Sequence, residues 1–141
     1  MRTILPIALC CLTVGACGFE DPTPSDIFFA ITGSEGAQVQ LVTSTQFAAG
    51  VNELGVTEVT LLHADTVTRT LPVDTVVSVR IDHRFFIEVL PLEGDSLPVR
   101  VEVDVDDRRL YGRSGLVVRE SPFRYVYVFN QPLTEIVDVV L

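Results

Sequence analysis

The sequence lacks tryptophan and lysine, and its few cysteines lie near its start. The three cysteines are Cys10, Cys11 and Cys17, so residues 18–141 have no thiol for a disulfide or a cysteine-based metal site. All ten basic residues are arginine, against nineteen acidic residues, which gives a formal charge of −9. A surface of this sign repels nucleic acid phosphates, so we expect no nucleic acid partner.

A hydrophobic run long enough to cross a membrane is also missing. Met1-Arg2-Thr3 precedes an uncharged apolar run over residues 4–16. This run is shorter than the roughly 20 residues that a transmembrane helix needs. A short basic start followed by such a run is typical of a cleaved signal peptide.

The apolar run ends in Val14-Gly15-Ala16-Cys17. This motif resembles the lipobox of bacterial lipoproteins, in which a peptidase cuts before the cysteine and the thiol carries a diacylglycerol. The resemblance implies that residues 1–16 are removed and that Cys17 is lipidated. The alternatives are an ordinary signal peptide with an incidental cysteine, and an uncleaved anchor helix.

A short polar tether follows the cysteine. Residues 17–25 include Pro22 and Pro24 and reach at most about 30 Å when extended. Gly18 stands where aspartate would resemble an inner-membrane retention signal, which favours the outer membrane. We therefore expect an acidic domain held close to a membrane of the bacterial cell envelope, in the periplasm or on the exterior.

From residue 26 onward the sequence has strand character and no sustained helical period. Alternation is clearest over residues 99–105, where Val99, Val101, Val103 and Val105 should face inward and Arg100, Glu102 and Asp104 outward. Residues 47–54 are expected to form a loop or a single helical turn. The segments with strand character are 27–31, 37–45, 56–63, 65–71, 76–81, 84–90, 99–105, 109–112, 116–120, 124–129 and 134–141.

These eleven segments, separated by Gly, Pro and Asp turns, are expected to make about nine short strands. This pattern predicts an all-β fold: a single antiparallel β-sandwich, immunoglobulin-like, over residues 26–141. A closed barrel is the alternative.

Four short motifs resemble the MmpS-like accessory proteins, which have an N-terminal membrane anchor and an immunoglobulin-like sandwich and accompany lipid exporters. The motifs lie between residues 27 and 129 and are Ile31-Thr32-Gly33-Ser34, Leu71-Pro72-Val73, the run from Val101 to Asp107, and Ser114-Gly115. The chain departs from that family in three ways: a lipobox replaces the transmembrane helix, Asp107 replaces a hairpin glycine, and a cysteine pair is missing. The resemblance implies an accessory role without catalysis.

Two groups of residues could hold a metal ion. Asp104, Asp106 and Asp107 could bind Ca²⁺, but the EF-hand pattern is absent, and a solvated hairpin turn neutralised by Arg108 and Arg109 explains them better. The pairs His63 with Asp65 and Asp82 with His83 could supply zinc ligands. Nothing in the sequence brings these pairs together, so we expect exposed turn residues and no metal or cofactor.

Ser114 lies in Gly112-Arg113-Ser114-Gly115, which is not the G-x-S-x-G elbow of hydrolases. We therefore expect no enzyme activity.

Aromatic residues and the last strand are candidates for binding. Tyr125, Tyr127 and Phe129 alternate on one face of a strand and either fill the core or bind a glycan or a partner. Residues 136–141 end the chain almost without charge and either dock in their own sheet or offer an open edge to a partner strand.

The first hypothesis is a non-enzymatic, membrane-anchored lipoprotein whose sandwich binds an envelope protein, as an accessory to an export complex. The alternative is a lipid- or glycan-binding module of the envelope. An open apolar groove between the sheets would favour the alternative, and a closed sandwich with one bare edge would favour the first hypothesis. Convergent histidine and carboxylate groups in a cleft would favour an enzyme.

Overall fold

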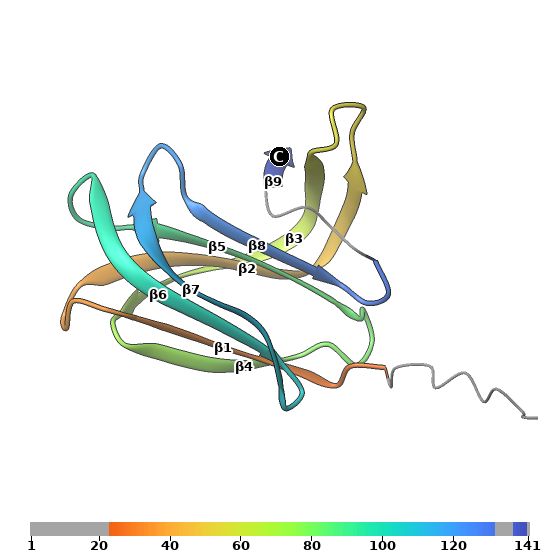
Figure 1. Ribbon diagram of the computed structural model, residues 1–141, viewed down its shortest axis with the longest axis horizontal. Coiled ribbons are helices and arrows are strands. Elements are labelled where there is room, and N and C mark those ends of the chain that lie inside the picture. Colours follow the sequence, from red (N-terminus) through yellow and green to blue (C-terminus); the bar gives the residue numbers. More distant parts are fainter. Residues whose placement is uncertain (1–22, 132–136, 141) are drawn as a thin grey trace, which may run out of the picture.

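The described residues, 23–131 and 137–140 of the computed structural model, form nine strands in two sheets (Figure 1). The strands are β1 (Asp26–Gly33), β2 (Gln38–Val51), β3 (Thr57–Thr70), β4 (Val73–Ser78), β5 (Arg84–Pro91), β6 (Ser96–Val105), β7 (Arg108–Val118), β8 (Phe123–Val128) and β9 (Val137–Val140). The four-stranded sheet has the order β4-β1-β6-β7, and the five-stranded sheet has the order β8-β5-β2-β3-β9. The predicted all-β sandwich is confirmed.

The main core lies between the two sheets and follows from the alternation of apolar residues. On β6, Val101 and Val103 are 2% and 0% exposed, as the valine pattern predicts. They face Phe85, Ile87 and residues of β2 in the opposite sheet, and the rings of Phe29 and Phe85 stack with centroids 5.7 Å apart. The inward and outward positions of residues 99–105 were thus predicted correctly.

Strands β2 and β3 are longer than predicted, because both continue past an irregularity. The register of β2 on β3 shifts between Thr43 and Phe47. There the Ser44 hydroxyl donates to the His63 carbonyl (2.5 Å) and accepts from the amide of Gln46 (3.0 Å). This bulge bends the β2–β3 hairpin, and β2 continues beyond it to Val51.

Two predictions about this hairpin are wrong. Residues 47–51 belong to β2, so the predicted loop or helical turn over residues 47–54 is wrong except for its last three residues. The predicted strands 56–63 and 65–71 are one strand, β3. The far half of the hairpin encloses a second small core, in which Phe47, Val59 and Phe86 are buried.

Further strand limits also differ from the prediction. Segments 109–112 and 116–120 are one strand, β7, and β4 begins three residues earlier than expected, directly after the cis Leu71–Pro72 bond. Strand β9 pairs parallel with β3, whereas the other strand pairs within the described residues are antiparallel. Residues 134–136 and 141 of the predicted last strand lie outside the described residues.

One long side of the sandwich is open. Strand β7 ends the four-stranded sheet and β8 ends the five-stranded sheet, and no ladder joins the two in the described part of the chain. The two edge strands run along the same side of the molecule (Figure 1). A groove lies between them.

Candidate functional site

A groove of about 1070 Å³ runs between the edge strands β7 and β8. Its floor is made by Val99, Val101, Val105 and Val117, whose side chains belong to the main core or border it. Pro24 lines one end, where the described chain begins, and Leu116 lines the other. The groove is therefore an extension of the core that reaches solvent.

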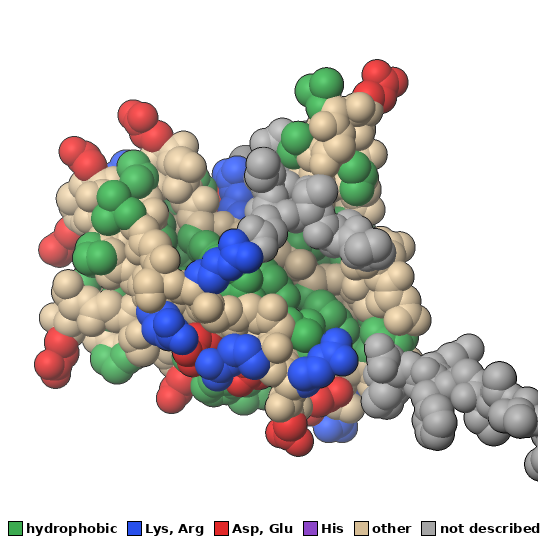
Figure 2. Space-filling view, viewed as in Figure 1, with side chains coloured by type: hydrophobic (Ala, Val, Ile, Leu, Met, Phe, Trp, Pro, Cys, Tyr) green, Lys and Arg blue, Asp and Glu red, His purple; other side chains and the backbone are tan. Residues whose placement is uncertain are grey.

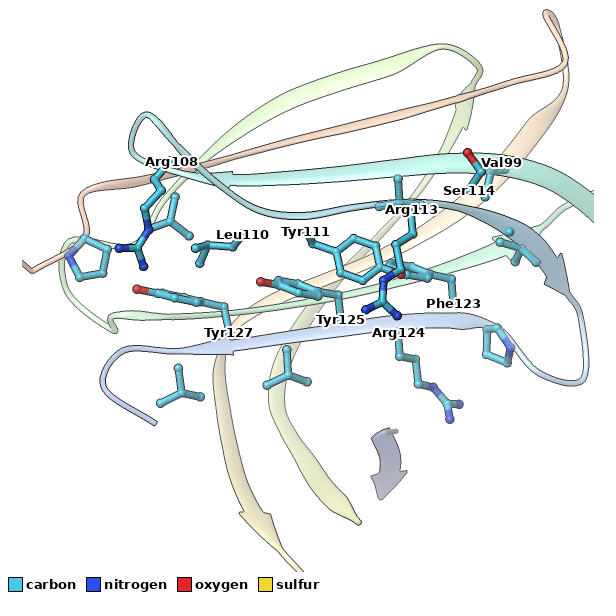
Figure 3. A pocket seen from close by; sticks show the side chains of 18 of the residues that line it. Val99, Arg108, Leu110, Tyr111, Arg113, Ser114, Phe123, Arg124, Tyr125 and Tyr127 are labelled. Atoms are coloured by element: carbon cyan, nitrogen blue, oxygen red, sulfur yellow. The ribbon is translucent and has the colours of Figure 1, made fainter. Parts of the chain in front are cut away.

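Four aromatic side chains form the walls (Figure 3). Phe123, Tyr125 and Tyr127 alternate along β8 and pair in register with Val89, Ile87 and Phe85 of β5. Paired residues of neighbouring strands point to the same face, so these three rings point inward.

Tyr111 of β7 closes the wall from the opposite sheet. Its ring centroid lies 5.4 Å from that of Phe123 and 5.3 Å from that of Tyr125. Tyr111, Phe123, Tyr125 and Tyr127 pack against the core and stay only half-buried. Both predicted roles, core filling and contact with a ligand, are therefore open to Tyr125 and Tyr127. Phe129 also lines the groove, and its ring contacts that of His83 with centroids 6.3 Å apart.

Burial changes the acidity of the central ring. The pKa of Tyr125 rises from 10.0 to about 12, first because burial disfavours the phenolate and then because Tyr127 and Tyr111 lie nearby. The Tyr125 hydroxyl is therefore protonated and uncharged at physiological pH. The groove thus has an aromatic wall with a neutral hydroxyl group.

Arginine side chains gather at the rim of the groove, although the chain is acidic. Figure 2 shows arginines along the border of an apolar strip on this face. Arg108 and Arg113 of β7 pair with the inward-facing Val105 and Val101, so both start on the groove side of the sheet. Arg113 lies over the Tyr111 ring at 5.7 Å, and Arg124 of β8 binds Glu88 at 2.5 Å.

The predicted acidic cluster does not form a calcium site. Asp104 binds Arg109 through two hydrogen bonds, which hold the pKa of Asp104 below its usual value. The Asp106 carboxylate instead accepts hydrogen bonds from the amides of Ser25 and Asp26, at 3.0 and 3.1 Å. The structure thus shows a hairpin turn in which Arg109 neutralises Asp104, as predicted. The neutralising role predicted for Arg108 is wrong, since no ion pair joins Arg108 to a carboxylate among the described residues.

The two histidines are not brought into a metal site. His63 and Asp65 lie 3.9 Å apart on β3 with exposed side chains, and Asp82 accepts a hydrogen bond from Thr45. His83 has its Nδ1 buried without a hydrogen-bond partner in the described structure. Among the described residues, no three His, Cys, Asp or Glu side chains are grouped to hold a metal ion.

Ser114 lies within β7 and pairs in register with Arg100. It lines the groove, but it stands in an extended strand and not in the strand-to-helix turn that exposes a nucleophile in hydrolases.

Several groove residues were not singled out from the sequence as ligand contacts, among them Tyr111, Phe123, Arg108 and Arg113. The β6–β7 register has an irregularity on β7 between Arg109 and Tyr111. Because of it, Arg108 lies on the same face as Tyr111, where alternation alone would place it on the opposite face, and Arg113 follows Tyr111 by ordinary alternation. A bulge has no simple signature here, so period-two reasoning along β7 could not assign its faces.

Comparison with protein-family models, curated proteins and solved structures finds no match to this chain. In the part of the chain that the structure describes, no helix has the length and apolar character to span a bilayer.

Proposed function

We propose that this protein is a non-enzymatic bacterial lipoprotein, anchored through Cys17, whose β-sandwich binds a lipid in the groove between β7 and β8. The observation that carries the proposal is an open apolar groove of about 1070 Å³ between the sheets. Ligand pockets have volumes of roughly 300 to 1000 Å³ and are mostly apolar with a few polar groups. A glycan is a poorer fit, because valines form the floor and offer no hydrogen bonds to hydroxyl groups.

The length of the groove suits a single acyl chain. The floor extends from Val99 to Val105, which is about 20 Å of extended strand. The acyl chains of one leaflet extend over about 15 Å, half the hydrocarbon thickness of a bilayer. One chain can thus lie along the groove in contact with the aromatic walls.

The place of the anchor supports a role at a membrane. Pro24 is buried at one end of the groove, only seven residues after Cys17. A lipidated Cys17 would hold this end within about 30 Å of the membrane surface. The outer membrane is the proposed location, since Gly18 is not the aspartate of the inner-membrane signal.

A protein partner is the second candidate. It is favoured by the edge strands β7 and β8. In the described structure, the backbone N–H and C=O groups along the groove side of each strand are not paired with another strand. A partner strand could pair with either edge. In this role the protein would be an accessory component of an envelope complex, which is the first hypothesis from the sequence.

The test uses the mature lipidated protein in vesicles of neutral phospholipid with a trace of a photoactivatable long-chain alcohol. Gly115 faces the groove, and a Cβ atom there would have no neighbour within 4 Å. Gly115→Phe should therefore fill the groove without disturbing the core. In the wild type we expect crosslinks on β7 and β8, located by mass spectrometry. In Gly115→Phe the yield of these crosslinks should fall about tenfold or more.

The matched control is Gly50→Phe on β2, where an added Cβ is equally unopposed but lies outside the groove. Its labelling should equal that of the wild type. Equal labelling of both variants would reject the groove as a lipid site. Reproducible in-cell crosslinks from β7 or β8 to one envelope protein, without lipid labelling, would favour the second candidate.

A further inference from the structure

We propose that the ligand is a long-chain fatty acid whose carboxylate binds Arg108 at the end of the groove next to Pro24. This inference rests on the proposed lipid-binding function and adds the chemical class and the orientation of the lipid. It is carried by the distribution of charge and apolar surface along the groove.

The two ends of the groove differ in chemistry. Pro24, Arg108 and Tyr127 lie at the end where the described chain begins, and Leu116, Val117 and Phe123 lie at the far end. The far end thus has apolar and aromatic side chains, with the Arg113 guanidinium lying over the Tyr111 ring, while the near end has the Arg108 guanidinium beside a tyrosine. An amphiphile would lie with its chain toward Phe123 and its polar group toward Arg108.

Arg108 is the best placed cation for an anionic group. Figure 3 shows its side chain extending from β7 across the mouth, toward the side of Tyr127. No ion pair joins Arg108 to a carboxylate among the described residues, whereas Arg124 is bound to Glu88 and Arg113 lies over Tyr111.

The acidic residues near this end leave room for a ligand carboxylate. Asp106 and Asp107 also line the groove there. However, Asp106 is turned to the amides of Ser25 and Asp26, and Asp107 is exposed in the hairpin turn. A carboxylate fits the two parallel N–H groups of a single guanidinium. The groove suits one acyl chain, whereas a phospholipid carries two, so its length favours a fatty acid over a phospholipid.

The experiment measures competition for the groove in the mature lipidated protein in neutral vesicles. The probe is the uncharged photoactivatable alcohol, and the competitors are palmitate and palmityl alcohol, which share a chain and differ in charge. For the wild type we expect palmitate to compete at least tenfold better than palmityl alcohol. Arg108→Gln should remove this preference while the alcohol still competes.

Arg69→Gln is the matched control, because Arg69 is exposed on β3 and away from the groove. It should retain the full preference for palmitate. Equal competition by acid and alcohol in the wild type would overturn the inference, as would an unchanged preference in Arg108→Gln. Loss of the preference in Arg113→Gln but not in Arg108→Gln would overturn the orientation. Failure of the alcohol probe to label the groove would instead reject the lipid-binding function itself.

Discussion

At the residue scale, Asp106 joins two distant parts of the chain at the near end of the groove. Its carboxylate accepts hydrogen bonds from the amides of Ser25 and Asp26, 80 or more positions earlier. Asp106 also has a positive φ of 48°, a conformation that Asp and Asn tolerate better than most residues. The same side chain therefore holds both the β6–β7 turn and the start of β1.

Asp106→Ala is expected to lower the free energy of unfolding by about 1–3 kcal/mol, since it removes both hydrogen bonds and strains the turn. Urea denaturation followed by circular dichroism measures this loss. Asp106→Asn keeps an acceptor oxygen and the tolerance for positive φ, so it should lose less. Asp107→Ala, at the exposed neighbour, should stay within about 0.5 kcal/mol of the wild type. A similar loss in Asp107→Ala would contradict this assignment.

Tyr125 should make the stability of the domain depend on alkaline pH. Its pKa is about 12 in the folded protein and 10.0 without burial, so the unfolded chain releases its proton first. The contribution is fully present below pH 10 and is lost as the pH rises through about 12. We expect a loss of about 1–2 kcal/mol, allowing for partial exposure of the ring.

The measurement is a urea denaturation series between pH 9 and 12, together with the ultraviolet absorbance of tyrosinate. Tyr125→Phe has no proton to lose, so its stability should fall less over this range. The absorbance of this variant should also lack the tyrosine titration near pH 12. A titration near pH 12 that persists in Tyr125→Phe would assign it to another tyrosine.

The residues of the site were only partly predictable from the sequence. Tyr125 and Tyr127 stand out because period-two alternation is a local property of the strand. Tyr111 and Arg108 do not, because their direction depends on a bulge in the pairing of β6 with β7. Their role also depends on β7 being an edge strand, which is decided by long-range pairing.

At the scale of elements, the bent β2–β3 hairpin changes what the five-stranded sheet can bury. Phe85 and Ile87 of β5 face the main core, so alternation would place Phe86 toward solvent. Phe86 is nevertheless 0% exposed, because the far half of the hairpin brings Phe47 and Val59 over it. The rings of Phe47 and Phe86 meet edge to face at 6.3 Å.

Phe86→Ala is therefore expected to cost about 3–5 kcal/mol, as in a main core, because it leaves a cavity among buried side chains. Phe85→Ala should cost a similar amount. Leu62→Ala is the control, since Leu62 on β3 is 73% exposed and should change stability by no more than about 0.5 kcal/mol. Urea midpoints give the three values, and a cost for Phe86→Ala as small as that for Leu62→Ala would show that the second core contributes nothing.

The same bend explains which elements the sequence could not predict. The strand over residues 99–105 was predictable, because its apolar face is buried by the ordinary two-layer packing. The continuation of β2 to Val51 was not, because it depends on the Ser44 hydroxyl reaching the His63 carbonyl across the hairpin. That hydrogen bond joins residues 19 positions apart, beyond the reach of any local pattern.

At the scale of the whole molecule, arginines gather at the groove although the chain is acidic. The chain has a formal charge of −9, yet Arg108, Arg113 and Arg124 line the groove. The acidic remainder is repelled by anionic head groups, which favours a domain that hangs from its tether and does not lie flat on the membrane. The proposed lipid site would then act beside the membrane without being embedded in it.

The proposed placement beside the membrane depends on one thiol, since Cys17 is the only cysteine after residue 16. Cys17→Ala should abolish labelling with radioactive palmitate, because no other thiol of the mature chain can accept the lipid. The leader should also stay uncut by the lipoprotein peptidase, which is seen as a heavier band on a gel. Cys11→Ala is the matched control: it changes a cysteine within the leader, six positions earlier, and should leave both labelling and cleavage intact. Palmitate labelling that persists in Cys17→Ala would refute the lipid anchor, and with it the placement of the groove within a tether's length of the bilayer.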